Sequence, residues 1–194
     1  MFLLIAILVG FGAGVLFGGH PGNLARLHLR WPGLIFFALV MQVAIFTGWS
    51  PLPRSLLPFL YVLSNVIAVV WLGRNIRVQG IPCVGLGAVS NLGAILANGG
   101  RMPVDGVLLT RARGAAAEAA IASGQSPSNS VLLNSHTRLP WLTDRFLLPS
   151  PFPFPTVFSV GDVLIGVGVA WLIAAGMRPV ARVAATPPNA SQAA

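Results

Sequence analysis

The stretch VFSVGDVLIGVGVAWLIAA, residues 157–175, decides the fold class, because Asp162 is the only charged residue among its nineteen. At a rise of about 1.5 Å per residue, such a helix approaches the length that crosses a hydrocarbon core of about 30 Å. Similar apolar segments occupy residues 2–17, 34–49, 56–72 and 81–97. The sequence therefore predicts an all-α polytopic membrane bundle of about five transmembrane helices.

The composition supports a lipid environment. The chain has 194 residues, of which 55% are hydrophobic and 8% are charged, whereas water-soluble domains carry about 25% charged residues. Its net charge of +8 comes from twelve basic and four acidic residues. The arginines are spread between the apolar segments, which is typical of topology signals rather than of a nucleic-acid patch. The bilayer is thus the expected partner, and nucleic acid is not.

Basic residues also predict the direction of the chain. They fall in the connections after the first and third segments and after the fifth, as Arg26 and Arg30, Arg74 and Arg77, and Arg178 and Arg182. The positive-inside rule places these connections in the cytoplasm, so that the N-terminus and the connection 99–156 are extracytoplasmic. We expect one transmembrane domain, residues 1–178, in a plasma membrane, and a disordered cytoplasmic tail, residues 179–194.

Small residues predict where helices approach one another closely. Gly10, Gly14 and Gly18 share one face of the first segment, and Gly85, Gly93, Gly161 and Gly168 are further candidates in the last two.

Asp162 is the most informative polar residue. It lies five residues into the last segment, about 7 Å below the predicted outer edge, where a carboxylate is costly and is functional by default. Asn98 and Arg101 follow the fourth segment and are expected at the same level, and Asn91 shares a helical face with Asn98. These residues predict a polar binding site or an internal ion pair with Asp162. The alternative is a capping turn at Asn98 and an arginine that extends to the headgroups.

The connection before the last segment offers further candidates in NSHTRLPWLTDRF, residues 134–146. His136 and Arg138 are candidate binding residues there, and Asp144 is a candidate acid or base. A single histidine with few acids does not predict a metal site, and no cofactor is expected. Cys83 is the only cysteine, which excludes an intrachain disulfide and a thiolate metal site.

A family resemblance rests on four blocks: NLARLHLR at 23–30, NGGRMPV at 98–104, H-T-R-L-x-x-L-x-D at 136–144 and S-V-G-D-V-L-I-G-V-G at 159–168. Together they resemble an uncharacterised domain-of-unknown-function family of bacterial multi-pass membrane proteins. The resemblance covers the chain to about Arg178. It implies an inner-membrane protein and no known activity.

The last block is also similar to a pattern of the lipoprotein signal peptidases, N-x-A-D-x-x-I-x-x-G, which carries one of their two catalytic aspartates. Asp162, Ile165 and Gly168 match its spacing, and Asp144 lies near the place of the other aspartate. Ser159 and Gly161 depart from the pattern, and five predicted spans replace four. This resemblance implies an intramembrane aspartic hydrolase in which Asp144 and Asp162 form an acid/base pair.

Three functions follow from these observations. The first is a non-enzymatic accessory or binding protein, with other membrane subunits, a lipid or a small solute as its partner. The second is the aspartic hydrolase. The third is a proton or solute carrier that uses Asp162, although five spans without an internal repeat argue against a standard transporter.

Overall fold

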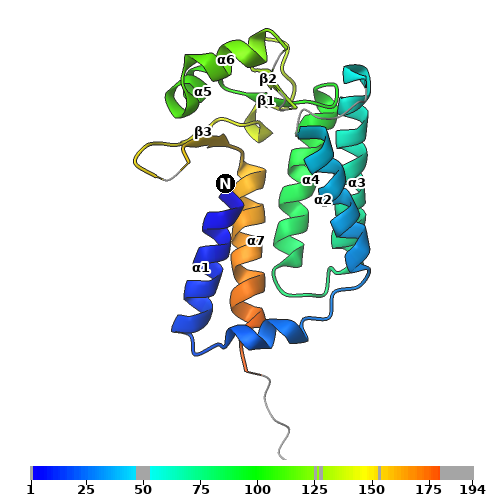
Figure 1. Cartoon of the computed structure of the whole chain (residues 1–194), viewed down its shortest axis with the longest axis vertical. Coiled ribbons are helices and arrows are strands. Elements are labelled where there is room, and N and C mark those ends of the chain that lie inside the picture. Colours follow the sequence, from blue (N-terminus) through cyan, green and yellow to red (C-terminus); the bar gives the residue numbers. More distant parts are fainter. Residues whose placement is uncertain (1, 47–52, 125, 127–128, 153, 180–194) are drawn as a thin grey trace, which may run out of the picture.

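The computed structural model describes residues 2–46, 53–124, 126, 129–152 and 154–179. This part of the chain is mostly helical, as the sequence predicts, and its five long helices lie side by side (Figure 1). They are α1 (Phe2–Leu16), α2 (Pro32–Phe46), α3 (Leu57–Arg74), α4 (Ile81–Ala97) and α7 (Val160–Gly176). The elements between α4 and α7 gather at one end of these helices and form a cap (Figure 1).

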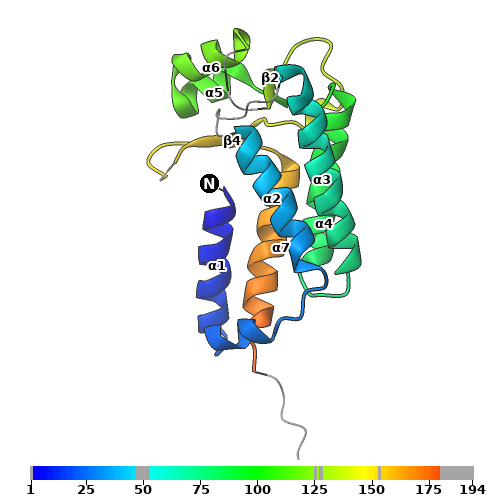
Figure 2. The ribbon, with the colours of Figure 1, turned by 45° about the vertical axis from the view of Figure 1, so that its right-hand side comes forward.

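The long helices form a row whose order differs from their order in the sequence. Helix α1 packs on α7, α7 on α4, α4 on α3, and α3 on α2, so the last helix lies between the first and the fourth (Figure 2). Gln42 of α2 donates a hydrogen bond to the Ser64 hydroxyl of α3 at 3.2 Å, which links the outermost pair. Helix α7 therefore has a neighbour on each side, and its first turn lies beneath the cap (Figure 1).

Glycine sets the closeness of α7 to its neighbours. A Cβ atom at Gly10 would lie 2.8 Å from the Ala170 carbonyl oxygen, and one at Gly168 would lie 2.6 Å from the Val84 amide nitrogen. Such distances are too short for any larger residue, so Gly10 and Gly168 make the close helix contacts that the sequence predicts for them. The prediction does not describe Gly18, Gly85 and Gly93, where a Cβ would meet nothing within 4 Å. Spacing alone does not say which glycine faces a partner.

One end of the row, opposite the cap, carries arginines without acids, and we call it the arginine end. Helices α1 and α2 are joined there by η1 (Pro21–Arg26), α3 and α4 are joined by residues 75–80, and the chain leaves α7 there. Exposed arginines of this end are Arg26, Arg30, Arg74, Arg77 and Arg178. The Asn75 side chain fixes the two connections together, since it accepts from the Arg30 amide at 2.7 Å and donates to the Arg30 carbonyl at 3.1 Å.

The cap, residues 98–159, is a folded unit rather than an open loop. It contains β1 (Met102–Val104), α5 (Gly106–Arg113), α6 (Ala115–Ala122), β2 (Ser130–Leu132), η3 (Pro140–Leu142), β3 (Phe146–Leu148) and β4 (Thr156–Phe158). Strand β1 pairs in parallel with β2, and β3 pairs antiparallel with β4. The all-α prediction did not include these strands. They are three residues each, too short to give a readable alternation of polar and apolar residues.

The last long helix begins later than the sequence predicts. Residues Thr156–Phe158 pair with β3, and Ser159 then caps a helix that starts at Val160. Asp162 therefore lies in the first helical turn rather than more than one turn inside the helix. The other long helices differ from the predicted segments by up to two residues at their described ends. Two predictions, the end of the second segment at 47–49 and the tail from residue 180, lie outside the described residues.

Among the described helices, α3 is long and apolar enough by length and composition to cross a membrane, with 18 residues and a mean hydropathy of 1.6. The other four long helices are apolar but shorter.

Candidate functional site

Asp162 is held in a polar network where α7 begins. Its Oδ1 accepts a hydrogen bond from the Asn91 side chain of α4 at 2.8 Å, and its Oδ2 accepts from the Ser159 amide at 3.1 Å. The Ser159 hydroxyl donates to Asn91 Oδ1 at 2.8 Å and accepts from the Asp162 amide at 3.0 Å. Gly161 makes room for this network, because a Cβ there would overlap the Asn91 side chain. Serine and aspartate thus form a capping box that Asn91 joins to the neighbouring helix.

Removal of Asn91 is expected to destabilise the contact between α4 and α7. An Asn91→Leu substitution leaves the Ser159 hydroxyl and one Asp162 oxygen without their partner, which costs about 1–3 kcal/mol for each buried group. Thermal unfolding in detergent micelles measures the change. Asn65→Leu is the matched control, because the Asn65 amide donates to the Tyr61 carbonyl within its own helix. Equal losses in the two variants would show that the network adds nothing to ordinary helix packing.

Asp144 lies in the cap, between the strands and η3. Its amide donates to the Pro103 carbonyl at 3.0 Å, and its carbonyl accepts from the Asp105 amide at 2.9 Å. These bonds fix the backbone of Asp144 beside β1, with which it forms a parallel bridge at Val104. The Oδ1 atom of its side chain is buried and has no hydrogen-bond partner in the described structure. A buried polar atom without a partner is uncommon and is a reason to look for a ligand or a proton.

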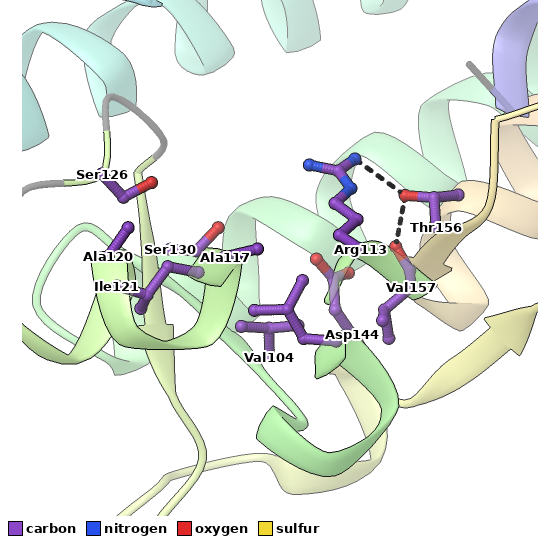
Figure 3. Close-up of a pocket in the computed structure, with 11 residues that line it drawn as sticks. Val104, Arg113, Ala117, Ala120, Ile121, Ser126, Ser130, Asp144, Thr156 and Val157 are labelled. Atoms are coloured by element: carbon purple, nitrogen blue, oxygen red, sulfur yellow. Dashed lines mark hydrogen bonds between the residues drawn. The ribbon is translucent and has the colours of Figure 1, made fainter. Parts of the chain in front are cut away.

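The side chain of Asp144 lines a cavity of about 350 Å³, which we call the cap cavity (Figure 3). Its walls include the aliphatic residues Val104, Leu109, Ala117, Ile121 and Val157, and polar groups from Arg113, Ser126, Ser130 and Thr156. Arg113, the last residue of α5, donates to the Thr156 hydroxyl of β4 at 3.0 Å. This volume falls within the range of about 300–1,000 Å³ that is usual for small-molecule sites.

The electrostatic environment keeps Asp144 neutral at pH 7. Burial, followed by the negative charge of Asp162, raises the pKa of the Asp144 carboxyl to about 8, although the Arg113 guanidinium acts in the opposite direction. A protonated carboxyl group is less costly to bury than a carboxylate and can donate a hydrogen bond. Asp144 therefore presents a neutral donor and acceptor, and Arg113 presents a positive charge.

A second cavity, of about 270 Å³, lies between α1 and α7 and is lined by Leu3, Phe158, Asp162, Ile165 and Gly166 together with Thr156 and Val157. Thr156 and Val157 line the cap cavity as well. Asp144 and Asp162 are thus close enough to interact electrostatically, but each lines a cavity of its own. The chemistry that this supports is ligand binding at Asp144, with Asp162 as a fixed negative charge beyond the shared wall.

Of the other candidates predicted from the sequence, Asn91 contacts Asp162, and the remaining four have no described hydrogen bond to either aspartate. Asn98 ends α4, where its side chain donates to the Ala94 carbonyl at 2.8 Å and exchanges two hydrogen bonds of 2.9 Å with the backbone of Arg138. It therefore caps the helix and ties it to the cap. The side chains of Arg101, Arg138 and His136 are exposed. Within the described residues no arginine forms a salt bridge with Asp162, whose bonds are to Asn91 and Ser159.

Two residues of the cap cavity, Arg113 and Thr156, are not singled out by the sequence. Arg113 is one of several arginines in a long connection, and Thr156 follows a proline-rich stretch. Thr156 reaches Arg113 in the folded cap, where β4 pairs with β3 and packs on α5. No spacing in the sequence signals that contact.

A known family matches most of the chain. The family described as Family of unknown function (DUF5317) covers residues 26–174. The chain belongs to this family. The match confirms the resemblance to an uncharacterised family and spans α2, α3, α4, the cap and most of α7. No curated protein and no solved structure matches the chain. The similarity to lipoprotein signal peptidases stays a prediction, and membership in the DUF5317 family by itself assigns no activity.

Proposed function

We propose that this member of the DUF5317 family is a multi-pass protein of the bacterial plasma membrane whose extracytoplasmic cap binds a small ligand without catalysis. The observation that carries the proposal is the cap cavity. Its partly aliphatic wall holds the neutral carboxyl group of Asp144, one oxygen of which has no hydrogen-bond partner in the described structure, and the guanidinium group of Arg113. A subunit that presents a captured ligand to other membrane proteins would need these features and no catalytic residues.

The exposed surface of the long helices supports insertion in a bilayer. Large apolar side chains are exposed on every one of them, including Leu8, Phe36, Phe59, Leu86 and Val167, which are 54–66% exposed. In α3 only 17% of the apolar window is buried in protein, unlike the core helix of a water-soluble protein. Helices of 15–18 residues reach about 22–27 Å, and a bilayer can thin locally around short spans.

The charges favour the proposed orientation. Arginines without acids occupy the arginine end, while the four acidic residues, Asp105, Glu118, Asp144 and Asp162, belong to the cap or to the first turn of α7. The positive-inside rule then assigns the arginine end to the cytoplasm and the cap to the outside.

Cysteine labelling in intact cells tests membrane insertion and orientation. In a Cys83→Ser background, His136→Cys in the cap is expected to react with a membrane-impermeant maleimide. Arg26→Cys at the arginine end is expected to react only after the cells are permeabilised. Reaction of both cysteines in intact cells, or of Arg26→Cys alone, would overturn the proposed orientation and with it an extracytoplasmic ligand site.

An aspartic hydrolase is the second candidate. The negative charge of Asp162 helps to keep Asp144 protonated, and an acid/base mechanism requires two carboxyl groups that differ in protonation in this way. The two cavities argue for the binding function, since a shared water needs both carboxyl groups in one site.

The isosteric Asp144→Asn variant distinguishes the two functions in a strain that lacks the chromosomal gene. Binding is expected to survive this change at neutral pH, because an amide is also neutral and can donate. A hydrolase is expected to lose at least about 100-fold in activity, and the variant would then fail to restore the strain's phenotype at a normal protein level. Failure of Asp144→Asn with normal protein levels would favour the hydrolase.

A further inference from the structure

We propose that the cap cavity binds an oxyanion on a short aliphatic body, a carboxylate or a phosphate monoester, whose charged group pairs with Arg113. This inference rests on the proposed function of the cap cavity as the ligand site, and it adds the chemical class of the ligand.

Arg113 has unused binding capacity. One of its terminal nitrogens donates to Thr156, and it forms no salt bridge with any described residue. A guanidinium group has five N–H donors in a planar fork that matches carboxylate and phosphate oxygens. The Arg113 side chain is partly open to solvent, and the contact with Thr156 holds one edge of its fork at the wall of the cavity. A fixed cation of this kind favours an anion with two adjacent oxygens.

The rest of the wall fits an aliphatic body. Val104, Leu109 and Val157 are buried at the base of the cap, where they form one apolar cluster against which Ala117 and Ile121 pack. All five line the cavity. Contact with such a wall favours burial of CH₂ groups, because it removes their apolar surface from water. A small inorganic anion would leave this surface unused, so an amphiphilic anion fits better.

Asp144 is expected to make the affinity for the ligand depend on pH. The ionisable groups that act on it are Arg113 from α5 and Asp162 from α7, and Tyr61 of α3 also interacts with it. Its neighbour Arg145 has an exposed side chain. While it is protonated, Asp144 can donate to an oxygen of the ligand. When it ionises near pH 8, its charge opposes an anion, so affinity is expected to fall as the pH rises above that value.

Two sources offer the same ligand chemistry. A free amphiphile in the aqueous phase carries such an oxyanion, and so does the headgroup of an anionic phospholipid in the outer leaflet. Hexanoate and hexyl phosphate represent the first source, and phosphatidic acid represents the second.

The test is calorimetric titration of the full-length protein in phosphatidylcholine nanodiscs, with empty nanodiscs subtracted. Hexanoate or hexyl phosphate is expected to bind, and hexyltrimethylammonium is not. Arg113→Gln is expected to weaken binding at least about tenfold, the usual effect of losing a hydrogen bond to a charged group. Arg111→Gln is the matched control, because Arg111 is an exposed arginine of the same helix that does not line the cavity. The affinity of the wild type for the anionic probes is expected to fall above pH 8, whereas the affinity of Asp144→Asn is expected to stay constant over the same pH range.

Each outcome decides the inference. A higher unfolding temperature in nanodiscs with phosphatidic acid, lost in Arg113→Gln but kept in Arg111→Gln, would identify the lipid headgroup as the source. Equal binding by the two arginine variants, equal binding of the cation, or no binding of any anionic probe would overturn the oxyanion inference. Hexyltrimethylammonium binding that is lost when Ala117→Phe fills the cavity would keep the proposed function and reject only the ligand class. Cysteine labelling judges the orientation independently.

Discussion

Replacing Gly87 with alanine is expected to force α4 and α7 apart and to lower stability by about 1–3 kcal/mol or more. A Cβ atom at Gly87 would overlap the Gly161 carbonyl oxygen and would lie 2.8 Å from the Ile165 amide nitrogen. Both are backbone atoms of α7, which no change of rotamer can move away. Because α7 also begins at the capping box, the strain is expected to reach the polar network of Asn91, Ser159 and Asp162.

Gly85 provides the control for this prediction. It lies on the same helix, two residues earlier, and a Cβ there would meet nothing within 4 Å. Gly85→Ala is therefore expected to be neutral or to stabilise the protein by up to about 1 kcal/mol, the difference in helix propensity. Thermal unfolding of both variants in the same micelles makes the comparison. If Gly85→Ala lost as much stability as Gly87→Ala, the close contact of the two helices would not be the cause.

The Asp144→Asn variant is expected to be more stable than the wild type at pH 8, by a difference that builds up as the pH rises from about 4 to about 8. The pKa of Asp144 is raised from 3.8 to about 8 in the folded protein. Between these values the folded state keeps a proton that the unfolded state has released, so wild-type stability falls as the pH rises. The loss is at most about 1.4 kcal/mol for each pH unit. Asparagine does not ionise and escapes this loss.

Denaturation of the two proteins between pH 4 and pH 9 measures this effect. Near pH 4 the folded proteins both have a neutral group at position 144, so the pH-dependent difference is expected to vanish there. It should grow up to about pH 8 and then become constant, because both states of the wild type are ionised above that pH. A constant difference across the whole range would mean that Asp144 ionises in the folded protein as it does in the unfolded chain.

The sequence predicts the long helices well because their signal is strong. Apolar runs such as 81–97 leave few alternatives, and α4 has these bounds. The sequence predicts the beginning of α7 too early because Val157 and Phe158 are as apolar as the helix that follows. These residues are extended because they pair with strand β3, Phe146–Leu148. The sequence of β3 does not indicate which segment of the chain it pairs with. Pairings between distant short strands depend on the assembled cap, which no local pattern records.

The candidate site was predictable in part. Asp162 and Asn91 stand out because polar residues are rare in apolar segments, and the structure brings them together. The expected arginine partner of Asp162 is absent from the described network, where the Asn91 side-chain amide and the Ser159 backbone amide donate to the carboxylate instead. The sequence does not single out Arg113, because its place at the cavity wall depends on a hydrogen bond to Thr156, 43 positions later in the sequence. The structure supplies this long-range contact.

The protonation state of Asp144 tests the account most directly, since ligand class and pH dependence both need a neutral carboxyl group in the cap cavity. Infrared spectroscopy distinguishes a protonated carboxyl group from a carboxylate. The difference between wild type and Asp144→Asn is expected to show a protonated carboxyl band at pH 7 that disappears with a midpoint near pH 8. A carboxylate at position 144 already at pH 5 would contradict the account.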